Sequence, residues 1–310
     1  MIEILAWAAV TLMALLTLTQ AVGWGNSRVV AVVQSATPLL LAPAIPIGVA
    51  AAILQHWPLA ITCVGIAVAL GVLVAPVVHH ASPRPSPGSP SMTIAYANLL
   101  VRNPTPMECM QALAGTDADV LVLVELSEEL SRALGGLVPG DYPYRCEQPL
   151  DNPRGHGVWS RHPILAGGLA LIGSNPVIDL VLDLRGTPVR VIEVHPAPPT
   201  IDPHRWTNDL AALASAQYEP AVPTVMVGDF NASRWHPAFR DLLRNEWTDA
   251  HEALGRGFSA SWPTDMALPP PFVRLDHALV RNGVEPISIS EIEIPGSDHR
   301  GFVLTVSVST

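Results

Sequence analysis

Charge is distributed so unevenly along this chain that we expect two regions with different surroundings. Up to Val78 the only formally charged side chains belong to Glu3 and Arg28, although the 310-residue sequence has a formal net charge of −10 and a mean hydropathy of +0.33. Nearly all of the acid therefore lies in the second part, whose roughly 220 residues are enough for one domain with a full core. We predict a membrane region at residues 1–78, a linker at 79–91 and one domain at 92–310.

Three uncharged apolar runs favour about three transmembrane helices, namely Ile4–Val22, Val29–Leu54 and Leu59–Val78. The first is long enough to cross a bilayer, and the second is interrupted by prolines that imply a kink or a broken segment. A cleaved signal peptide is the alternative for the first run, but that run lacks a basic start and further apolar runs follow. Buried helices of a soluble domain are the alternative for all three.

The segment His79–Pro90 is rich in proline and serine, which predicts a semi-extended, exposed linker. Three crossings would place the two ends of the chain on opposite sides of the membrane. Arg28 and Arg84 both lie on the side of the second part, so the positive-inside rule places that part in the cytoplasm.

The acidic balance and the cysteines narrow the possible functions. An acidic domain lacks the basic footprint expected of a protein that binds an extended nucleic-acid backbone. The three cysteines, Cys63, Cys109 and Cys146, form neither a metal-binding spacing nor a disulfide framework. Cys109 and Cys146 could pair in an oxidising compartment, and the sequence leaves this open.

The segment Thr224–Trp235 is the strongest candidate for a reactive site. Its apolar run Val225–Val227 reads as a buried strand, and Gly228 is expected to let the backbone turn where the strand ends. Asp229 and Asn231 are two residues apart, so in extended geometry both point to the same side. Together they can hold a metal-bound phosphate and orient a water, although a turn rich in Asx residues is the alternative.

Three further polar residues stand at the ends of predicted strands. Asn98 ends a strand that starts at Thr93, and Glu125 follows the apolar run Val120–Val124. A hard cation such as Mg²⁺ takes carboxylate oxygens of this kind, although an acid at a helix N-terminus is the alternative for Glu125. His195 ends another strand and can donate to a phosphoryl oxygen, and an ordinary exposed histidine is the alternative.

The C-terminal part adds a possible acid–base pair. Asp276 lies inside an apolar strand, where an unpaired charge is costly, so it should have a partner. Asp298 and His299 lie in a polar turn before the last strand, which suggests a metal or water carboxylate beside a base. His299 with Asp276 behind it would form a general-base pair.

The second part alternates between strands and short helices, which predicts two packed sheets flanked by helices, an α/β (α+β) architecture. A hairpin-type turn at Arg185–Pro188 joins two of the strands. Another strand, Gly155–Ile164, carries Arg161, which could stabilise substrate or sheet packing. A surface arginine beside a proline turn is the alternative for Arg161.

These motifs together resemble the endonuclease/exonuclease/phosphatase superfamily. In chain order they are Asn98, Glu125, Ser160-Arg161, His195, Gly228-Asp229-Phe230-Asn231, Leu275-Asp276-His277 and Ser297-Asp298-His299. Each motif alone is weak, but together in this order they are specific, and the resemblance runs from about Thr93 to the C-terminus. It implies a four-layer α/β sandwich with two packed mixed sheets and cleavage of phosphoester bonds with Mg²⁺ or a similar cation such as Mn²⁺.

The resemblance also implies a role for each matching residue. Asn98 and Glu125 would form the metal site, with Asp298 a further acid at the metal. Asp229 would orient or activate the attacking water, and Asn231 would steady the phosphate. His195 and His299 would contact the phosphoryl group or act as base, with Asp276 behind His299. This division of roles agrees with the charge neutralisation that phosphoryl transfer needs.

The resemblance leaves the substrate open. Membrane helices before such a domain are similar to a group of bacterial membrane proteins of the teicoplanin-resistance type, which implies a multi-pass protein of the cell membrane with an extracytoplasmic catalytic domain. An extracytoplasmic domain disagrees with the cytoplasmic placement that Arg28 and Arg84 predict, and we follow the resemblance. A membrane tether and an acidic domain favour a lipid-linked or small phosphorylated substrate over nucleic acid. A membrane-anchored nuclease and a catalytically silent binding module are the alternatives.

Overall fold

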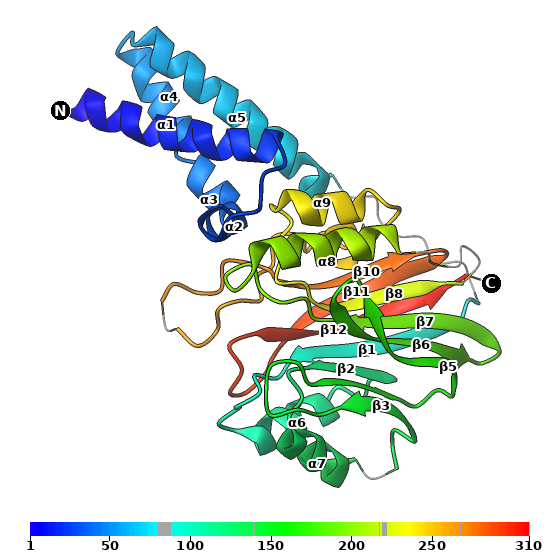
Figure 1. Ribbon diagram of the computed structural model, residues 1–310. Helices are drawn as coiled ribbons and strands as arrows, with labels where there is room; N and C mark the ends of the chain where they lie inside the picture. The colour runs from blue at the N-terminus through cyan, green and yellow to red at the C-terminus, as the bar shows by residue number, and fades with distance from the viewer. Residues whose placement is uncertain (80–87, 139, 217, 219–221, 267, 310) are drawn as a thin grey trace.

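The computed structural model describes residues 1–79, 88–138, 140–216, 218, 222–266 and 268–309 (Figure 1). An N-terminal bundle of helices stands on one side of a larger domain that contains all of the strands. Most of the predicted linker, residues 80–87, lies outside the described residues.

The larger domain is built on two six-stranded mixed sheets. In spatial order the first contains β11 (Val284–Glu293), β12 (Arg300–Val308), β1 (Ser91–Asn98), β2 (Val120–Val124), β4 (His156–Ser160) and β3 (Tyr144–Gln148). The second contains β5 (Ile164–Ile172), β6 (Asn175–Leu184), β7 (Thr187–Val194), β8 (Thr224–Asp229), β10 (Asp276–Arg281) and β9 (Thr248–Asp249). The expected hairpin at Arg185 joins β6 to β7.

Helices cover the outer faces of both sheets, as the expected four-layer sandwich requires (Figure 1). The first sheet is covered by α6 (Pro106–Ala114) and α7 (Glu128–Leu137), and the second by α8 (Pro203–Ser215) and α9 (Pro237–Leu243), with the short α10 (Ala250–Ala253) nearby. Strand β2 is buried on both faces. Val120, Val122 and Val124 point between the sheets, while Leu121 and Leu123 point to the helices. Its continuous apolar run is the pattern of a strand without a solvent face.

Strand directions bring the polar strand ends together at one edge. Strands β1 and β2 are parallel, and so are β7 and β8, so Asn98, Glu125, His195 and Asp229 all leave the sheets on the same side. Strand β10 is antiparallel to β8 and pairs Asp276 with Asp229, so it starts where β8 ends. Strand β12 is antiparallel to β1, which places His299 at this edge as well.

The N-terminal region contains α1 (Ile2–Ala21), α2 (Arg28–Ser35), α3 (Thr37–Leu41), α4 (Ala44–Ile53) and α5 (Trp57–Val78). By length and composition α1 and α5 could each cross a membrane. The middle run is bent by 80° between Ser35 and Thr37, so it forms a third span only if the bent pair counts as one. The bend lies at Ala36, and Pro38 stands in the first turn of α3, where the N–H group that proline lacks has no partner within the helix.

The structure corrects one expectation and answers one question that the sequence left open. Gly228 does not provide a turn, because it lies within β8; a Cβ there would lie 1.9 Å from the carbonyl oxygen of Val194 on β7. The glycine is therefore needed for close approach of two backbones. Cys109 and Cys146 are unpaired and pack into different clusters, Cys109 under the helices and Cys146 between the sheets.

Candidate active site

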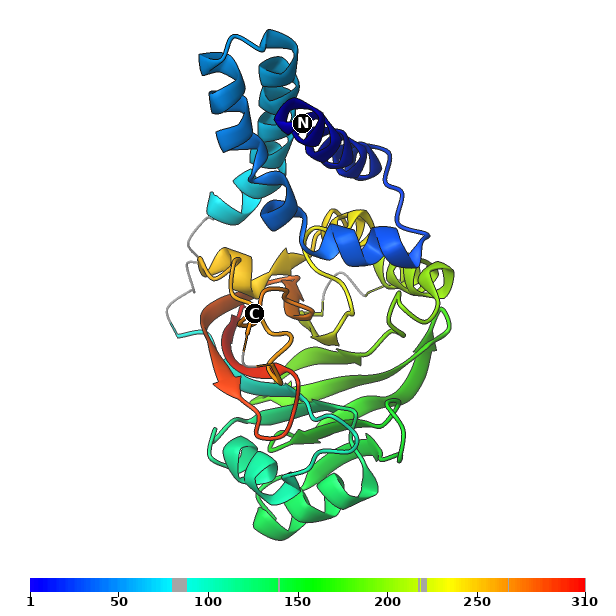
Figure 2. The ribbon, with the colours of Figure 1, turned by 90° about the vertical axis from the view of Figure 1, so that its left-hand side faces the viewer.

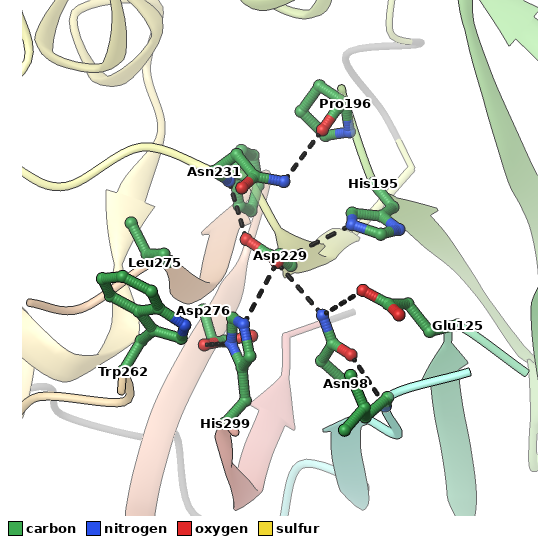
Figure 3. A network of polar contacts seen from close by, with 12 residues as sticks. Asn98, Glu125, His195, Pro196, Asp229, Asn231, Trp262, Leu275, Asp276 and His299 are labelled. Atoms are coloured by element: carbon green, nitrogen blue, oxygen red, sulfur yellow. Dashed lines mark hydrogen bonds and ion pairs between the residues drawn. The ribbon is translucent and has the colours of Figure 1, made fainter. Parts of the chain in front are cut away.

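The carboxylate of Asp229 lies at the centre of a polar cluster (Figure 3). Its Oδ2 accepts a hydrogen bond of 3.2 Å from the Asn98 side-chain amide. The Nε2 atoms of His195 and His299 lie 3.7 and 3.8 Å from the same oxygen. The side chains expected from four separate strand ends therefore meet around one buried oxygen.

Glu125 is the second carboxylate of the cluster. Its Oε1 accepts from the Asn98 amide at 3.2 Å, and its Oε2 accepts from the backbone N–H of Val101 at 3.1 Å. The backbone of Glu125 is left-handed, with φ of 56°. Such a conformation is uncommon outside glycine and is maintained where surrounding contacts dictate it, often at functional sites. The same contacts leave both carboxylate oxygens with lone pairs facing the cluster.

His299 is held by a carboxylate on its far side. Its Nδ1 lies 2.7 Å from Oδ2 of Asp276, and Oδ1 of Asp276 accepts from the Tyr96 hydroxyl at 2.7 Å. Asp276 thus has the partner that its position in an apolar strand requires. Both of its oxygens are occupied, so it orients His299 and does not itself face the cavity.

Burial and mutual charge perturb the titration of this cluster. Burial raises the pKa of Asp229 to about 7, and the charge of Asp276 adds to the effect. Burial alone would lower the pKa of His299, but the charges of Asp276 and Asp229 more than offset it and raise the pKa to about 10. Burial lowers the pKa of His195. His299 is therefore the protonated member, suited to donate to a phosphoryl oxygen through Nε2.

The donor set fits a hard divalent cation. Asp229, Asp276 and His299 offer ligand atoms within 4.8 Å of one another. Both oxygens of Asp276, however, already accept hydrogen bonds, Oδ2 with His299 Nδ1 and Oδ1 from the Tyr96 hydroxyl. Glu125 and Asp229 instead offer carboxylate oxygens to a cation. The Asn98 amide faces them with its N–H group, and its Oδ1 accepts from the backbone N–H of Leu100 at 3.1 Å. Mg²⁺ needs only one or two carboxylates, with waters and substrate completing its shell.

Asn231 and Asp298 lie at the same site with additional contacts. The backbone N–H of Asn231 donates to Asp229 Oδ1 at 2.7 Å, which is an Asx turn, and its side-chain amide donates to the carbonyl of Pro196 at 3.0 Å. The φ of Asn231 is 48°, so the extended geometry expected for these two residues does not hold. Asp298 Oδ2 accepts from the indole N–H of Trp262 at 3.1 Å, which gives this tryptophan a positioning role that its sequence did not reveal.

A buried histidine that the sequence reading missed also reaches the site. Strand β4 is antiparallel to β2, and His156 pairs with Val124, directly before Glu125. Its Nδ1 lies 2.9 Å from both oxygens of Glu193, while its buried Nε2 has no partner among the described residues. Burial alone would lower the pKa of His156, but the charge of Glu193 raises it. His156 can therefore donate a further hydrogen bond into the site.

Arg161, expected as a substrate contact, lies at the opposite end of β4. Its guanidinium pairs with Asp117 Oδ1 at 2.7 Å and lies over the ring of Tyr142. It does not line the cavity that contains the cluster. The error has a physical cause: β4 runs antiparallel, so the first residue of the strand, and not the last, meets the reactive edge.

The cluster opens into a cavity of about 850 Å³. The polar end is formed by Glu125, His195, Asp229, Asn231, Asp298 and His299 together with His156. The remaining wall combines apolar residues, among them the proline-rich segment 196–199 and Ala31 and Val32 of α2, with polar ones that include Arg154, Asp202 and Arg205. A cavity of this size accommodates a substrate much larger than a phosphate group.

Comparison with solved structures agrees with this fold. Structurally similar proteins include D. rerio TDP2 complexed with a single-strand DNA product, with 15% identity, a TM-score of 0.60, and coverage of 70% of this chain and 99% of that chain. An endonuclease/exonuclease/phosphatase family protein from Bacteroides thetaiotaomicron has 14% identity, a TM-score of 0.59, and coverage of 74% and 100%. At such identities the likeness concerns the fold. No curated protein shows significant similarity to the chain.

The family assignment rests on the sequence. The model of the Endonuclease/Exonuclease/phosphatase family matches residues 95–299, which is more than half of the chain and includes every residue from Asn98 to His299 discussed above. The chain therefore belongs to the Endonuclease/Exonuclease/phosphatase family.

Proposed function

We propose that this protein is a membrane-anchored, divalent-metal-dependent phosphoesterase that hydrolyses a lipid-linked or small phosphorylated substrate. The observation that carries the proposal is the convergence of Asn98, His195 and His299 on Oδ2 of Asp229, beside Glu125. A base, two donors and oxygen ligands for a cation are the parts that attack of water on a phosphoester requires.

Each residue has a distinct part in this proposal. Glu125 and Asn98, with Asp298 at the same cavity, would hold the cation, and Mg²⁺ or Mn²⁺ there would neutralise charge on the phosphoryl oxygens. Asp229 orients the attacking water and takes its proton, since its raised pKa suits a base near neutral pH. His195 and His299 donate N–H groups to the phosphoryl oxygens, and Asn231 steadies the phosphate.

The substrate class follows from charge and from the N-terminal helices. The chain carries a formal net charge of −10, which opposes binding of a nucleic-acid polyanion. Helices α1 and α5 are long and apolar enough to hold the domain at a bilayer, where lipid-linked phosphates are concentrated. We place the catalytic domain on the extracytoplasmic side of the cell membrane. A membrane-anchored nuclease is the second candidate, because a similar structure holds a DNA product.

The direct test is hydrolysis by the full chain, reconstituted in lipid nanodiscs, with Mg²⁺, with Mn²⁺ and with EDTA. The panel contains isoprenyl and phospholipid phosphates, sphingomyelin, inositol phosphates and plasmid DNA. We expect EDTA-sensitive turnover of a lipid substrate. Glu125→Gln should lower it about a thousandfold at limiting Mg²⁺, because it removes a charge from the cation site.

Three other results of this assay would change the proposed function. Nicking of plasmid without lipid turnover would assign the site to the nuclease function. Turnover by Glu125→Gln close to wild type would remove the metal site from the proposal. A folded protein that binds Mg²⁺ and turns over nothing in the panel would favour a catalytically silent binding module.

A further inference from the structure

Helix α2 lies between the apolar helices and the catalytic domain, across the top of that domain beside α8 (Figure 2). It follows α1 in the chain and precedes the bent pair α3–α4. One part of the N-terminal region is thus placed directly against the domain that contains the reactive cluster.

Three contacts fix α2 to the catalytic domain. The guanidinium of Arg28 donates to the carbonyl of Ile201 at 2.8 Å, in the loop that follows the His195 strand. The ring of His236 donates from Nε2 to the carbonyl of Ala31 at 2.8 Å, and the Ser233 hydroxyl donates to the carbonyl of Ser35 at 3.4 Å. Ala31 is 1% exposed and packs within the apolar cluster that α8 and α9 form on the second sheet.

Helix α2 also forms part of the reactive cavity. Ala31, Val32 and Ser35 line the same cavity of about 850 Å³ that contains Asp229 and His299. Apolar residues of the catalytic domain, including Pro198, Ile201 and Leu275, line it as well. The cavity therefore joins a polar, reactive end to an apolar surface that Ala31 and Val32 of α2 form together with the catalytic domain, and Arg154, Asp202 and Arg205 also line it.

The chemistry of the two ends specifies one occupant. The polar end fits a phosphoryl group, and the apolar wall fits a hydrocarbon chain attached to that group. Because α2 connects two apolar helical segments, a chain on this wall lies next to the region where a lipid tail would be buried. We infer that α2 forms a binding site for the hydrocarbon chain of an amphiphilic phosphoester and selects such substrates over soluble ones. The inference rests on the proposed phosphoesterase function and names the element that sets its specificity.

The test measures how affinity depends on the length of the ligand's alkyl chain, in the wild type and in variants of α2. Full-length protein in nanodiscs is titrated with butyl phosphate and octyl phosphate by calorimetry, with empty nanodiscs as blank, and Mg²⁺-dependent phosphate release is measured in parallel. Each fully buried methylene should strengthen binding about fourfold, so octyl phosphate should bind at least about tenfold more tightly. Val32→Trp fills the apolar wall and should abolish this preference while leaving butyl phosphate binding within about twofold. Val29→Trp, on the same helix but outside the cavity lining, is the matched control.

The two measurements separate the inference from the function. Equal affinity for both chain lengths, or an equal loss of both ligands in Val32→Trp, would overturn the inference even if phosphate is released. Absence of phosphate release from either ester would count against hydrolysis of such substrates, while a chain-length preference removed by Val32→Trp and kept by Val29→Trp would still support the site on α2.

Discussion

Two neighbouring residues of β10 take part in two histidine–aspartate pairs that share one geometry and differ in surroundings. Asp276 binds His299 Nδ1 at 2.7 Å, and His277 binds Asp249 Oδ2 through its own Nδ1 at 2.7 Å. The Nε2 of His277 contacts the carbonyl of Ala232 at 2.9 Å, so both of its ring nitrogens are used inside the protein. The Nε2 of His299 faces Asp229 in the cavity. The two histidines therefore differ at Nε2. His299 presents this nitrogen to the cavity and can be reactive, whereas His277 uses it inside the protein and is structural.

The carboxylates of Asp249 and Asp229 differ in the same way, because the first has its contacts inside the protein and the second faces the cavity. Burial would raise the pKa of Asp249, but the charge of Arg274 and hydrogen bonds from His251 and His277 hold it well below its usual range. Asp249 also caps α10 by accepting from the backbone N–H groups of His251 and Glu252. It is therefore a stabilising anion with every contact inside the protein. Asp229, with a pKa raised to about 7, is the carboxylate left able to exchange a proton.

The largest expected effect is a loss of turnover when His299 of the Asp276–His299 pair is replaced. His299→Asn should lower turnover by about 10² to 10³, because it removes a charged donor from the phosphoryl position. Metal affinity should change little, since we assign the cation to Glu125 and Asn98. Turnover and Mg²⁺ binding are measured on the same nanodisc preparation. A parallel loss of Mg²⁺ affinity would show that His299 is a ligand and would break the comparison.

His277→Asn should have the opposite profile. Removing one partner leaves Asp249 buried with less compensation, which should cost about 3 kcal/mol of unfolding free energy. Turnover per folded molecule should remain within about threefold of wild type. Chemical unfolding of the full chain in detergent measures the first quantity, and activity corrected for folded fraction the second. If the free energy of unfolding is unchanged while turnover falls, the structural role assigned to the His277–Asp249 pair is wrong.

A third histidine, His236, has both ring nitrogens hydrogen-bonded inside the protein, and neither partner is a carboxylate. His236 accepts from the backbone N–H of Ser233 at Nδ1 and donates to Ala31 from Nε2, both at 2.8 Å, so only the neutral ring fits. Burial lowers its pKa to about 4, below the value of about 6.5 expected when unfolded. The unfolded state then binds more protons between these pH values, so stability rises with pH from 4 to 6.5 and is constant above.

This contribution amounts to about 3 kcal/mol between pH 4 and 6.5. It is measured as the difference in unfolding free energy between wild type and His236→Asn, which removes the contributions of other titrating groups. The difference should be constant from pH 8 to 6.5 and should shrink below that. A difference independent of pH down to 4.5 would mean that His236 is not held neutral by its contacts with Ser233 and α2.

The smallest expected effect concerns His156, whose buried Nε2 has no hydrogen-bond partner among the described residues. His156→Asn should lower turnover about tenfold, the weight of one charge-assisted hydrogen bond to substrate. Arg161→Ala, at the other end of the same strand, should leave turnover unchanged and is the control. Equal effects of the two variants would indicate that both act only through the packing of β4.

The sequence by itself determined which residue types stand at which strand ends. Apolar runs followed by Asn98, Glu125, His195 and Asp229 were sufficient to predict strands with polar ends, because a fully buried strand can place charge only where it leaves the sheet. The scarcity of charge before Val78, where Glu3 and Arg28 are the only formally charged side chains, likewise indicated the apolar helices. These features are local, so pattern and composition reveal them, and the order of the motifs identified the family.

Only the tertiary structure decided how these ends combine. The direction of β4 chose His156 over Arg161, and the pairing of β10 with β8 and of β12 with β1 placed Asp276 between Tyr96 and His299. The contact of α2 with the cavity joins segments more than 160 residues apart, as in the hydrogen bond from Arg28 to Ile201. Strand direction and long-range docking depend on the packing of the whole chain, so no local pattern in the sequence contains them.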